Sequence, residues 1–84
     1  MTRAPGPDDA LQAKQARATV LRALESIPLQ RRAVLVMHDL DEVPMGQVAK
    51  ALSIPLFTAY SRLRKARKEL EAAIRRIGRE ESGP

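Results

Sequence analysis

Apolar residues recur at helical spacing through most of this chain, and proline or glycine breaks the pattern at a few positions. In the first periodic stretch, Asp8 or Asp9 can cap a helix by accepting hydrogen bonds from its free backbone amides. Pro28 ends that helix because it cannot continue the hydrogen-bond ladder. The apolar positions between these signals are Leu11, Val20, Leu24 and Ile27. We therefore predict a first helix that ends before Pro28.

The stretch from 29 to about 40 has a different pattern, since its centre is apolar in every direction. The run from Ala33 to Met37 contains no polar residue. A helix that is hydrophobic all round is enclosed by its neighbours. This stretch is therefore predicted as a second helix at the centre of the core.

An acidic connector, residues 39–42, separates the second helix from a third. Pro44 suits the first turn of a helix, where its missing N–H costs nothing. The apolar pattern then reaches Leu52, so we predict a short third helix over residues 44–52.

Ser53, Ile54 and Pro55 form a tight turn, and a longer helix is predicted to begin near Pro55 or Leu56. Gly78 is read as its stop signal. The expected buried positions of this fourth helix are Ala59, Leu63, Ala66, Leu70, Ile74 and Ile77.

A short helix, a tight turn and a longer helix form a helix-turn-helix, here over about residues 44–68. β-Branched residues are too scattered to form alternating strand patterns. We predict an all-α fold of four helices, winged-helix-like in its DNA-binding part but without a wing. The domain is expected over residues 10–79, with flexible segments at 1–9 and 80–84, where proline and glycine are frequent.

Composition excludes several kinds of function. The chain has 84 residues, no cysteine and one histidine, His38, so disulfides, thiolate sites and histidine metal clusters are not expected. A chain of this length has little room for a catalytic cleft. The acidic connector lacks the partners that acid–base chemistry needs. We expect no enzyme activity, no cofactor and no metal.

The net charge of +5 is concentrated near the end of the chain. Between 62 and 79, eight Lys and Arg residues stand against Glu69 and Glu71, and the remainder is nearly neutral. Such a basic segment favours a polyanionic partner, nucleic acid above all. No apolar run approaches the ~20 residues that span a bilayer. We expect a cytoplasmic protein without a membrane segment.

Two segments carry a resemblance to a known family. Residues 24–34 resemble the L-x-x-L-P-x-x-x-R-x-V opening of region 4 in bacterial sigma factors, with Ile27 and Arg32 at the corresponding places. Downstream, Gln47-Val48-Ala49, Thr58, Ser61-Arg62-Leu63 and Ala66-Arg67 follow the family's order of E-I-A, a turn, G-T-V-x-S-R-L and a terminal A-R. The pattern is most similar to the extracytoplasmic-function (ECF) group.

The resemblance implies a function in transcription initiation. Region 4 of such factors binds the minus-35 element of promoter DNA through the second helix of its helix-turn-helix, and it docks on the flap of the RNA polymerase β subunit. An anti-sigma factor is a further implied partner. Nothing here matches region 2, which opens the minus-10 element. The chain is therefore interpreted as a fragment, a separately expressed domain or a naturally short protein.

The sequence departs from the family pattern at several positions. Gln47 stands where Glu is usual, and Ser53 replaces a frequent turn glycine. Phe57 and Ala59 occupy the usual G-T-V positions, and Tyr60 stands where Lys or Arg is common. Because three departures lie on or beside the reading helix, the promoter sequence does not follow from the resemblance.

The predicted DNA contacts combine basic, hydroxyl and aromatic side chains, which bind phosphates and base edges. They are Thr58, Tyr60, Ser61, Arg62, Arg64, Lys65, Arg67 and Arg32. For three of them a structural role stays open.

Those structural roles are as follows. Arg32 can pair with Asp39 or Glu42, Arg67 can pair with Glu71, and Tyr60 can be partly buried. For Phe57, insertion into the core is favoured over exposure at the helix start. For His38, a partly buried, hydrogen-bonded ring is favoured over DNA contact.

Two alternatives to the function in promoter binding stay open. A response-regulator-type helix-turn-helix is an alternative within the DNA-binding class. A protein-interaction module, in which the apolar faces of the first and fourth helices hold a partner, is an alternative outside it. Duplex affinity that is lost only on adding the partner would indicate both functions.

Overall fold

A computed structural model describes residues 6–82 and is helical almost throughout, with no strand among those residues. The predicted all-α fold is confirmed. Its elements are α1 (Pro7–Glu25), α2 (Leu29–Leu35), the π-helix η1 (Val36–Leu40), α3 (Met45–Leu52) and α4 (Leu56–Glu81). The predicted flexible segments lie partly outside the described residues, while residues 7–9 and 80–81 are helical.

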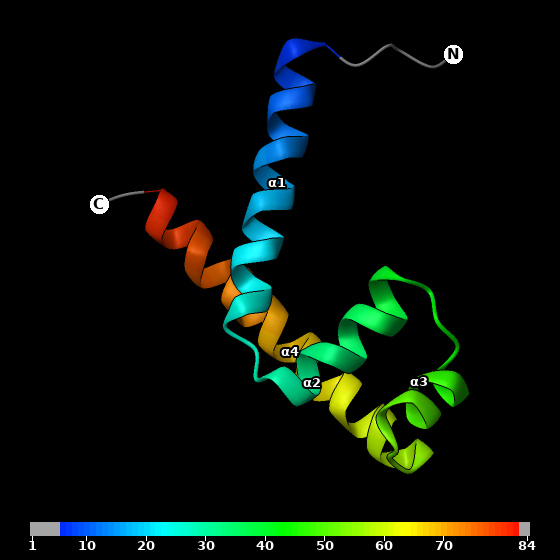
Figure 1. Cartoon of the computed structure of the whole chain (residues 1–84). Coiled ribbons are helices and arrows are strands. Elements are labelled where there is room, and N and C mark those ends of the chain that lie inside the picture. The colour runs from blue at the N-terminus through cyan, green and yellow to red at the C-terminus, as the bar shows by residue number, and fades with distance from the viewer. Residues whose placement is uncertain (1–5, 83–84) are drawn as a thin grey trace.

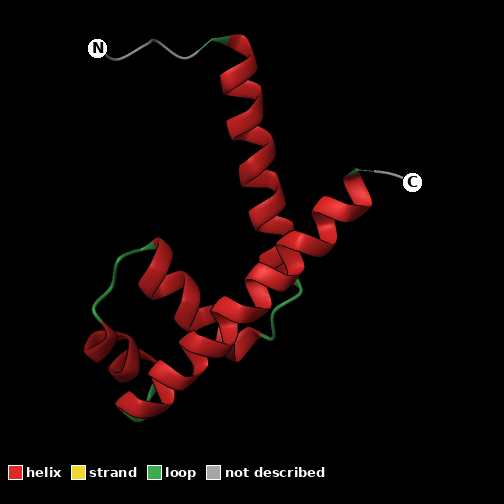
Figure 2. Ribbon diagram, turned by 180° about the vertical axis from the view of Figure 1, so that it is seen from behind, coloured by secondary structure: helices red, strands yellow, loops and turns green. Residues whose placement is uncertain are grey.

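Helix α4 is the element against which the others pack. In Figure 1 it runs along the molecule, with α1, α2 and α3 resting against it. Seen from behind, α4 lies in front of the other helices and keeps one uncovered side (Figure 2). One helix therefore contributes both to the core and to the surface.

The main core lies between α2, α3 and the first half of α4. Its buried residues come from the end of α1, the turn that follows it, α2, α3 and α4. They are Leu24, Ile27, Val34, Leu35, Met45, Val48, Ala49, Ala59, Leu63 and Ala66. A second, smaller cluster of Ala23, Ala73 and Ile77 joins the end of α1 to the second half of α4. The predicted buried stripe of α4 is confirmed at Ala59, Leu63, Ala66 and Ile77, whereas Leu70 and Ile74 are half-buried.

The first half of α1 differs from its prediction. Residues 10–18 are exposed, and Leu11, expected on the buried stripe, is 54% exposed. Figure 1 shows the reason, because this half of α1 extends beyond the helices that could cover it. The helix also begins at Pro7, and Asp9 accepts a hydrogen bond from the Gly6 amide over 3.2 Å.

The second predicted helix is divided into α2 and η1. In η1 the Asp41 amide donates to the Val36 carbonyl, five residues back, over 2.9 Å. The Val43 amide then donates to the Met37 carbonyl. A π-helix is rare and often lies near a functional site. No local sequence pattern predicted it.

Gly78 does not stop α4, which continues to Glu81. A glycine inside a helix costs about 1 kcal/mol relative to alanine. Contacts on either side of it oppose that cost, since Ile77 is buried and Arg22 pairs with Glu80 and Glu81 across to α1. Tertiary packing therefore overrides the local signal.

Leu63 offers a direct test of this core, since it is only 3% exposed and belongs to the main cluster. Replacing it with Asp places an unpaired carboxylate among apolar side chains, which costs several kcal/mol. We expect Leu63→Asp to lose most helical circular dichroism and its cooperative melt. The neighbouring exposed Arg64→Asp should keep both, and a folded Leu63→Asp would contradict the assigned core.

Candidate nucleic-acid interface

Helices α3 and α4 and the turn between them form the predicted helix-turn-helix. Met45, Val48 and Ala49 bury the inner face of α3. The chain then reverses at Ser53, whose backbone is left-handed with φ 54° and ψ 45°. The Ile54 amide donates to the Ala49 carbonyl over 3.0 Å, a six-residue closure of the kind that ends many helices. Serine thus adopts the conformation that glycine reaches more easily.

The surface of the first half of α4 divides into three lines, set by the 100° rotation per residue of a helix. The outward line lies opposite the buried stripe and contains Phe57, Ser61, Arg64 and Lys68. A second line faces η1 and contains Tyr60, Arg67 and Glu71, and a third faces the start of α2 and contains Thr58, Arg62, Lys65 and Glu69. Side chains of different lines meet different partners.

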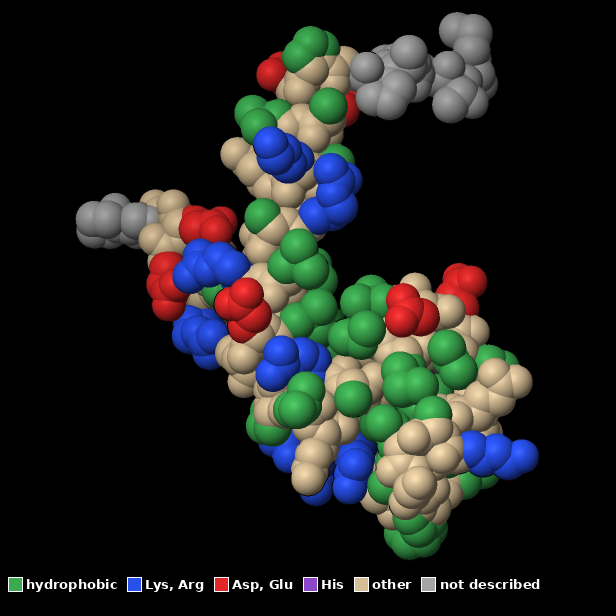
Figure 3. Space-filling view, in the orientation of Figure 1, with side chains coloured by type: hydrophobic (Ala, Val, Ile, Leu, Met, Phe, Trp, Pro, Cys, Tyr) green, Lys and Arg blue, Asp and Glu red, His purple; other side chains and the backbone are tan. Residues whose placement is uncertain are grey.

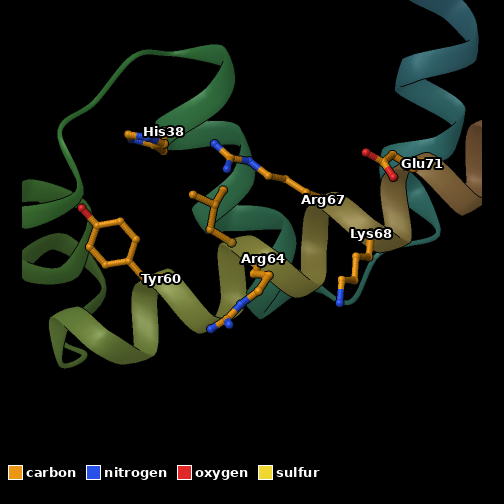
Figure 4. A pocket seen from close by; sticks show the side chains of 7 residues that line it. His38, Tyr60, Arg64, Arg67, Lys68 and Glu71 are labelled. Atoms are coloured by element: carbon orange, nitrogen blue, oxygen red, sulfur yellow. The ribbon is translucent and has the colours of Figure 1, made fainter.

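Figure 4 shows the first two of these lines. Arg64 and Lys68 point away from the bundle, whereas Tyr60 and Arg67 project toward η1, where His38 lies. The first pair of side chains is therefore directed toward anything that approaches the uncovered side of α4.

Arg67 does not pair with Glu71, which was the structural alternative in the sequence. It donates two hydrogen bonds to Asp39 of η1, from Nε to Oδ2 over 2.8 Å and from Nη2 to Oδ1 over 2.7 Å. These bonds from the guanidinium, more than its charge, lower the pKa of the Asp39 carboxyl. The carboxylate stays ionised at neutral pH, and the pair is lost only as pH falls below the ordinary range of about 4.

A second bidentate pair joins α2 to α4. Arg31 donates from Nε to Oε1 of Glu69 and from Nη2 to Oε2 over 3.0 Å. The hydrogen bonds from Arg31 lower the pKa of Glu69, and the nearby Lys65 charge acts in the same direction. The two residues lie 38 positions apart, so no local pattern in the sequence pointed to this pair.

The structural alternative for Arg32, a pair with Asp39 or Glu42, is not found among the described residues. Its Nε donates instead to the Ile27 carbonyl over 3.2 Å, which binds α2 to the end of the preceding turn. His38 is half-buried, and its Nδ1 donates to the Val43 carbonyl over 2.8 Å. The partly buried, hydrogen-bonded histidine that the sequence favoured is confirmed.

Four basic side chains in the first half of α4 form no ion pair with the described residues: Arg62, Arg64, Lys65 and Lys68. Of the sequence candidates, Thr58, Ser61, Arg62 and Lys65 line one shallow recess, together with Gln30 and Arg31 from α2. Tyr60 and Arg67 lie on the other side of the outward line, and Arg64, on that line, borders the same surface as they do. Sequence reasoning missed Gln30, which lies on α2, and Lys68, which directly follows the Ala66-Arg67 end of the family pattern.

The expectation that Phe57 is inserted into the core is wrong. Its side chain is 77% exposed and lies beside Thr58, Ser61 and Arg62 in the recess. The core has no place for it because Phe57 lies on the side of α4 opposite Ala59 and Leu63. Tyr60 is also mainly exposed, at 51%, rather than buried against α3.

An apolar hollow lies elsewhere, between α1 and η1. We use this name for the surface formed by Ala16, Arg17, Val20, Leu21, Leu24 and Leu40. Leu21 is 62% and Leu40 is 54% exposed. In Figure 3 hydrophobic side chains fill the angle between the lower part of α1 and the rest of the molecule. This surface has the chemistry of a protein contact, not a DNA contact.

Other kinds of site find no support in the described part of the chain. Residues 6–82 contain no cluster of three or more His, Cys, Asp or Glu that could hold a metal ion. None of the helices within that range has the length and apolar character to span a bilayer.

Comparison with known proteins agrees with this geometry. Residues 17–70 match the family described as Sigma-70, region 4. The chain is 26% identical over 69 residues to the ECF RNA polymerase sigma factor SigW of Bacillus subtilis (strain 168), a match that covers 82% of this chain and 37% of that protein. It is 25% identical over 68 residues to the ECF RNA polymerase sigma-E factor of Escherichia coli (strain K12), covering 81% of this chain and 36% of that protein.

The matched segment contains the last part of α1, all of α2, η1 and α3, and the basic first half of α4. The chain spans little more than a third of the length of these two relatives. Since the family match extends over well more than half of this chain, the chain belongs to the Sigma-70, region 4 family, in its ECF type.

Proposed function

We propose that this domain binds the minus-35 element of promoter DNA with the first half of α4 in the major groove. The observation that supports this most is the uncovered side of α4, where four basic side chains have no ion-pair partner among the described residues. Two of them lie on the outward line and two on the third line beside it. The major groove of B-DNA admits an α-helix, and HTH proteins read bases from the N-terminal part of their second helix.

The arrangement assigns different tasks to different side chains. Lys65 and Lys68 neutralise phosphates, and Arg64, which points straight outward, reaches the base edges or the adjacent backbone. Thr58 and Ser61 supply short hydroxyl donors beside Arg62. Arg67 is held toward η1 by Asp39, and Arg32 is engaged with the Ile27 carbonyl, so both contribute less to DNA contact than their position in the motif suggests.

We further propose that the apolar hollow is the surface that docks on RNA polymerase, at the flap of its β subunit. The hollow lies on α1 and η1, away from the outward line of α4, so both contacts can be made at once. This joins the protein-interaction alternative to the DNA-binding function within one domain. A competing anti-sigma factor would bind the same hollow and release polymerase.

A salt titration tests the DNA contact. A single helix-turn-helix buries only about 600–1,000 Å², so the isolated domain should bind duplex DNA weakly. Four neutralised phosphates predict a log–log slope of about −3.6, at ~0.9 per contact. Lys68→Ala should reduce that slope by about 0.9, because Lys68 is proposed to neutralise a phosphate, while Arg76→Ala, about two turns further along α4, should leave it unchanged. A salt-independent affinity, or equal effects of both variants, would contradict the proposed binding face.

The Asp39–Arg67 pair predicts a gain of affinity on mutation. In Asp39→Asn the Arg67 guanidinium loses its charged partner and becomes available to a phosphate. The expected result is tighter duplex binding and a salt slope steeper by about 0.9. Asp41→Asn makes the same charge change without releasing an arginine and is the control. Identical slopes for the two variants would show that Arg67 stays away from DNA.

Polymerase docking is tested with a charge in the hollow. Leu21→Asp should weaken capture by polymerase core roughly tenfold or more, because burying an unpaired carboxylate costs more than ~1.4 kcal/mol. Its helicity and duplex affinity should change little, since Leu21 is exposed and far from the outward line. Leu11→Asp places the same charge on α1 outside the hollow and should be neutral. Equal capture of both variants would remove the hollow from the interface.

A further inference from the structure

Phe57 is the most exposed large apolar side chain among the described residues, at 77%. It stands at the second position of α4, and the adjacent first-turn residue Leu56 is 49% exposed. Phe57 is not part of the core, because the buried stripe lies on the opposite side of the helix. The first turn of α4 therefore exposes apolar side chains. The basic side chains of this helix begin only at Arg62.

The position of Phe57 on the helix limits what it can contact. It shares the outward line with Ser61 and Arg64, one and two turns further along. Tyr60 lies on a different line and projects toward η1, as Figure 4 shows. Among the two aromatic residues of the chain, only Phe57 lies on the line that enters the groove.

The surroundings of Phe57 favour DNA over an apolar protein surface. Its recess is lined by Gln30, Arg31, Thr58, Ser61, Arg62 and Lys65, which are all polar or basic. A hydrophobic protein partner would have to desolvate these groups without pairing them, which is unfavourable. At a DNA groove, the phosphates can pair with the basic side chains of the recess. The major groove also offers one apolar feature, the 5-methyl group of thymine.

We propose that Phe57 is a specificity-determining residue that contacts a thymine methyl group in the major groove of the promoter element. The inference rests on the proposed function and adds to it the chemistry of one base position. Bidentate arginine contacts select guanine, and an apolar ring at the start of the helix selects thymine. The selectivity comes from burying one methyl group between the ring and the base.

The experiment compares thymine with deoxyuridine, which pairs identically but lacks the methyl group. Duplexes are first selected from a randomised pool with the wild-type domain, and each thymine of the selected site is then replaced in turn. We expect at least one replacement to weaken wild-type binding about fourfold, the effect of losing one buried methyl group. Phe57→Ala should bind the thymine and deoxyuridine duplexes equally at that position.

Leu11→Ala is the matched control, because it removes an exposed apolar side chain that lies outside both the DNA-binding face and the apolar hollow, and it should keep the fourfold discrimination. Circular dichroism verifies that Phe57→Ala is folded. Equal discrimination by wild type and Phe57→Ala, or a selected site with no methyl-sensitive thymine, would overturn the role of Phe57. Weaker polymerase capture by Phe57→Ala with unchanged discrimination would assign the ring to a protein interface and overturn it as well.

The same titrations separate failure of this inference from failure of the proposed function. Steep salt dependence with no methyl effect would refute the thymine contact and leave the DNA-binding function intact. Absence of salt-dependent duplex binding would refute both.

Discussion

The close packing of small residues along α4 is the constraint on which the rest of the structure depends. Ala59 and Ala66 are fully buried, and Ala73 is nearly so. Each stands where a larger side chain would hold a neighbouring helix further away. Through this stripe α1, α2 and α3 all gather on one side of α4. Packing them on one side leaves the opposite side uncovered, and that side is the outward line.

Ion pairing then determines which basic residues near the reading face have no carboxylate partner. Arg31 and Arg67 hold carboxylates of the neighbouring segments in bidentate geometry, which brings α2 and η1 against α4. Exposed ion pairs contribute little to stability, typically less than ~1 kcal/mol. Their larger effect here is on the distribution of charge, because two of the basic side chains near the reading face are neutralised locally. In the first half of α4, the basic side chains without an ion-pair partner among the described residues are thus Arg62, Arg64, Lys65 and Lys68.

Sequence patterns predicted the elements well because helical periodicity and proline positions are local signals. The positions of the turn at Ser53 and of the start of α4 follow from neighbouring residues alone. The end of α4 does not follow from neighbouring residues. The helix continues past Gly78 because its last turns contact α1, which lies far away in the sequence. The π-helix was missed for a similar reason, as its wider turn depends on hydrogen bonds that continue into the connector at Val43.

The candidate site shows the same division. The motif placed Thr58, Ser61 and the basic residues on the second helix of the helix-turn-helix, and the structure places them there. It could not determine which neighbouring segment each face of the helix meets in the folded domain, or that Asp39, 28 residues earlier, holds Arg67. The exposure of Phe57 was misjudged because an isolated aromatic residue in a small chain is usually counted toward the core.

The two proposed contacts differ in the physical source of their affinity. A basic face gains affinity from long-range attraction and depends on salt, whereas an apolar hollow gains it from burial and depends on shape. Placing the hollow on α1 and η1 keeps its apolar side chains away from the phosphates. The basic side chains of the reading face lie on α4, so Arg17 is the one charged residue among those that line the hollow. The long α4 makes this separation possible, because it packs against α1 at one end and presents the reading surface at the other. A weak DNA contact and a separate protein contact then combine, since a domain held on polymerase samples DNA at a high effective concentration.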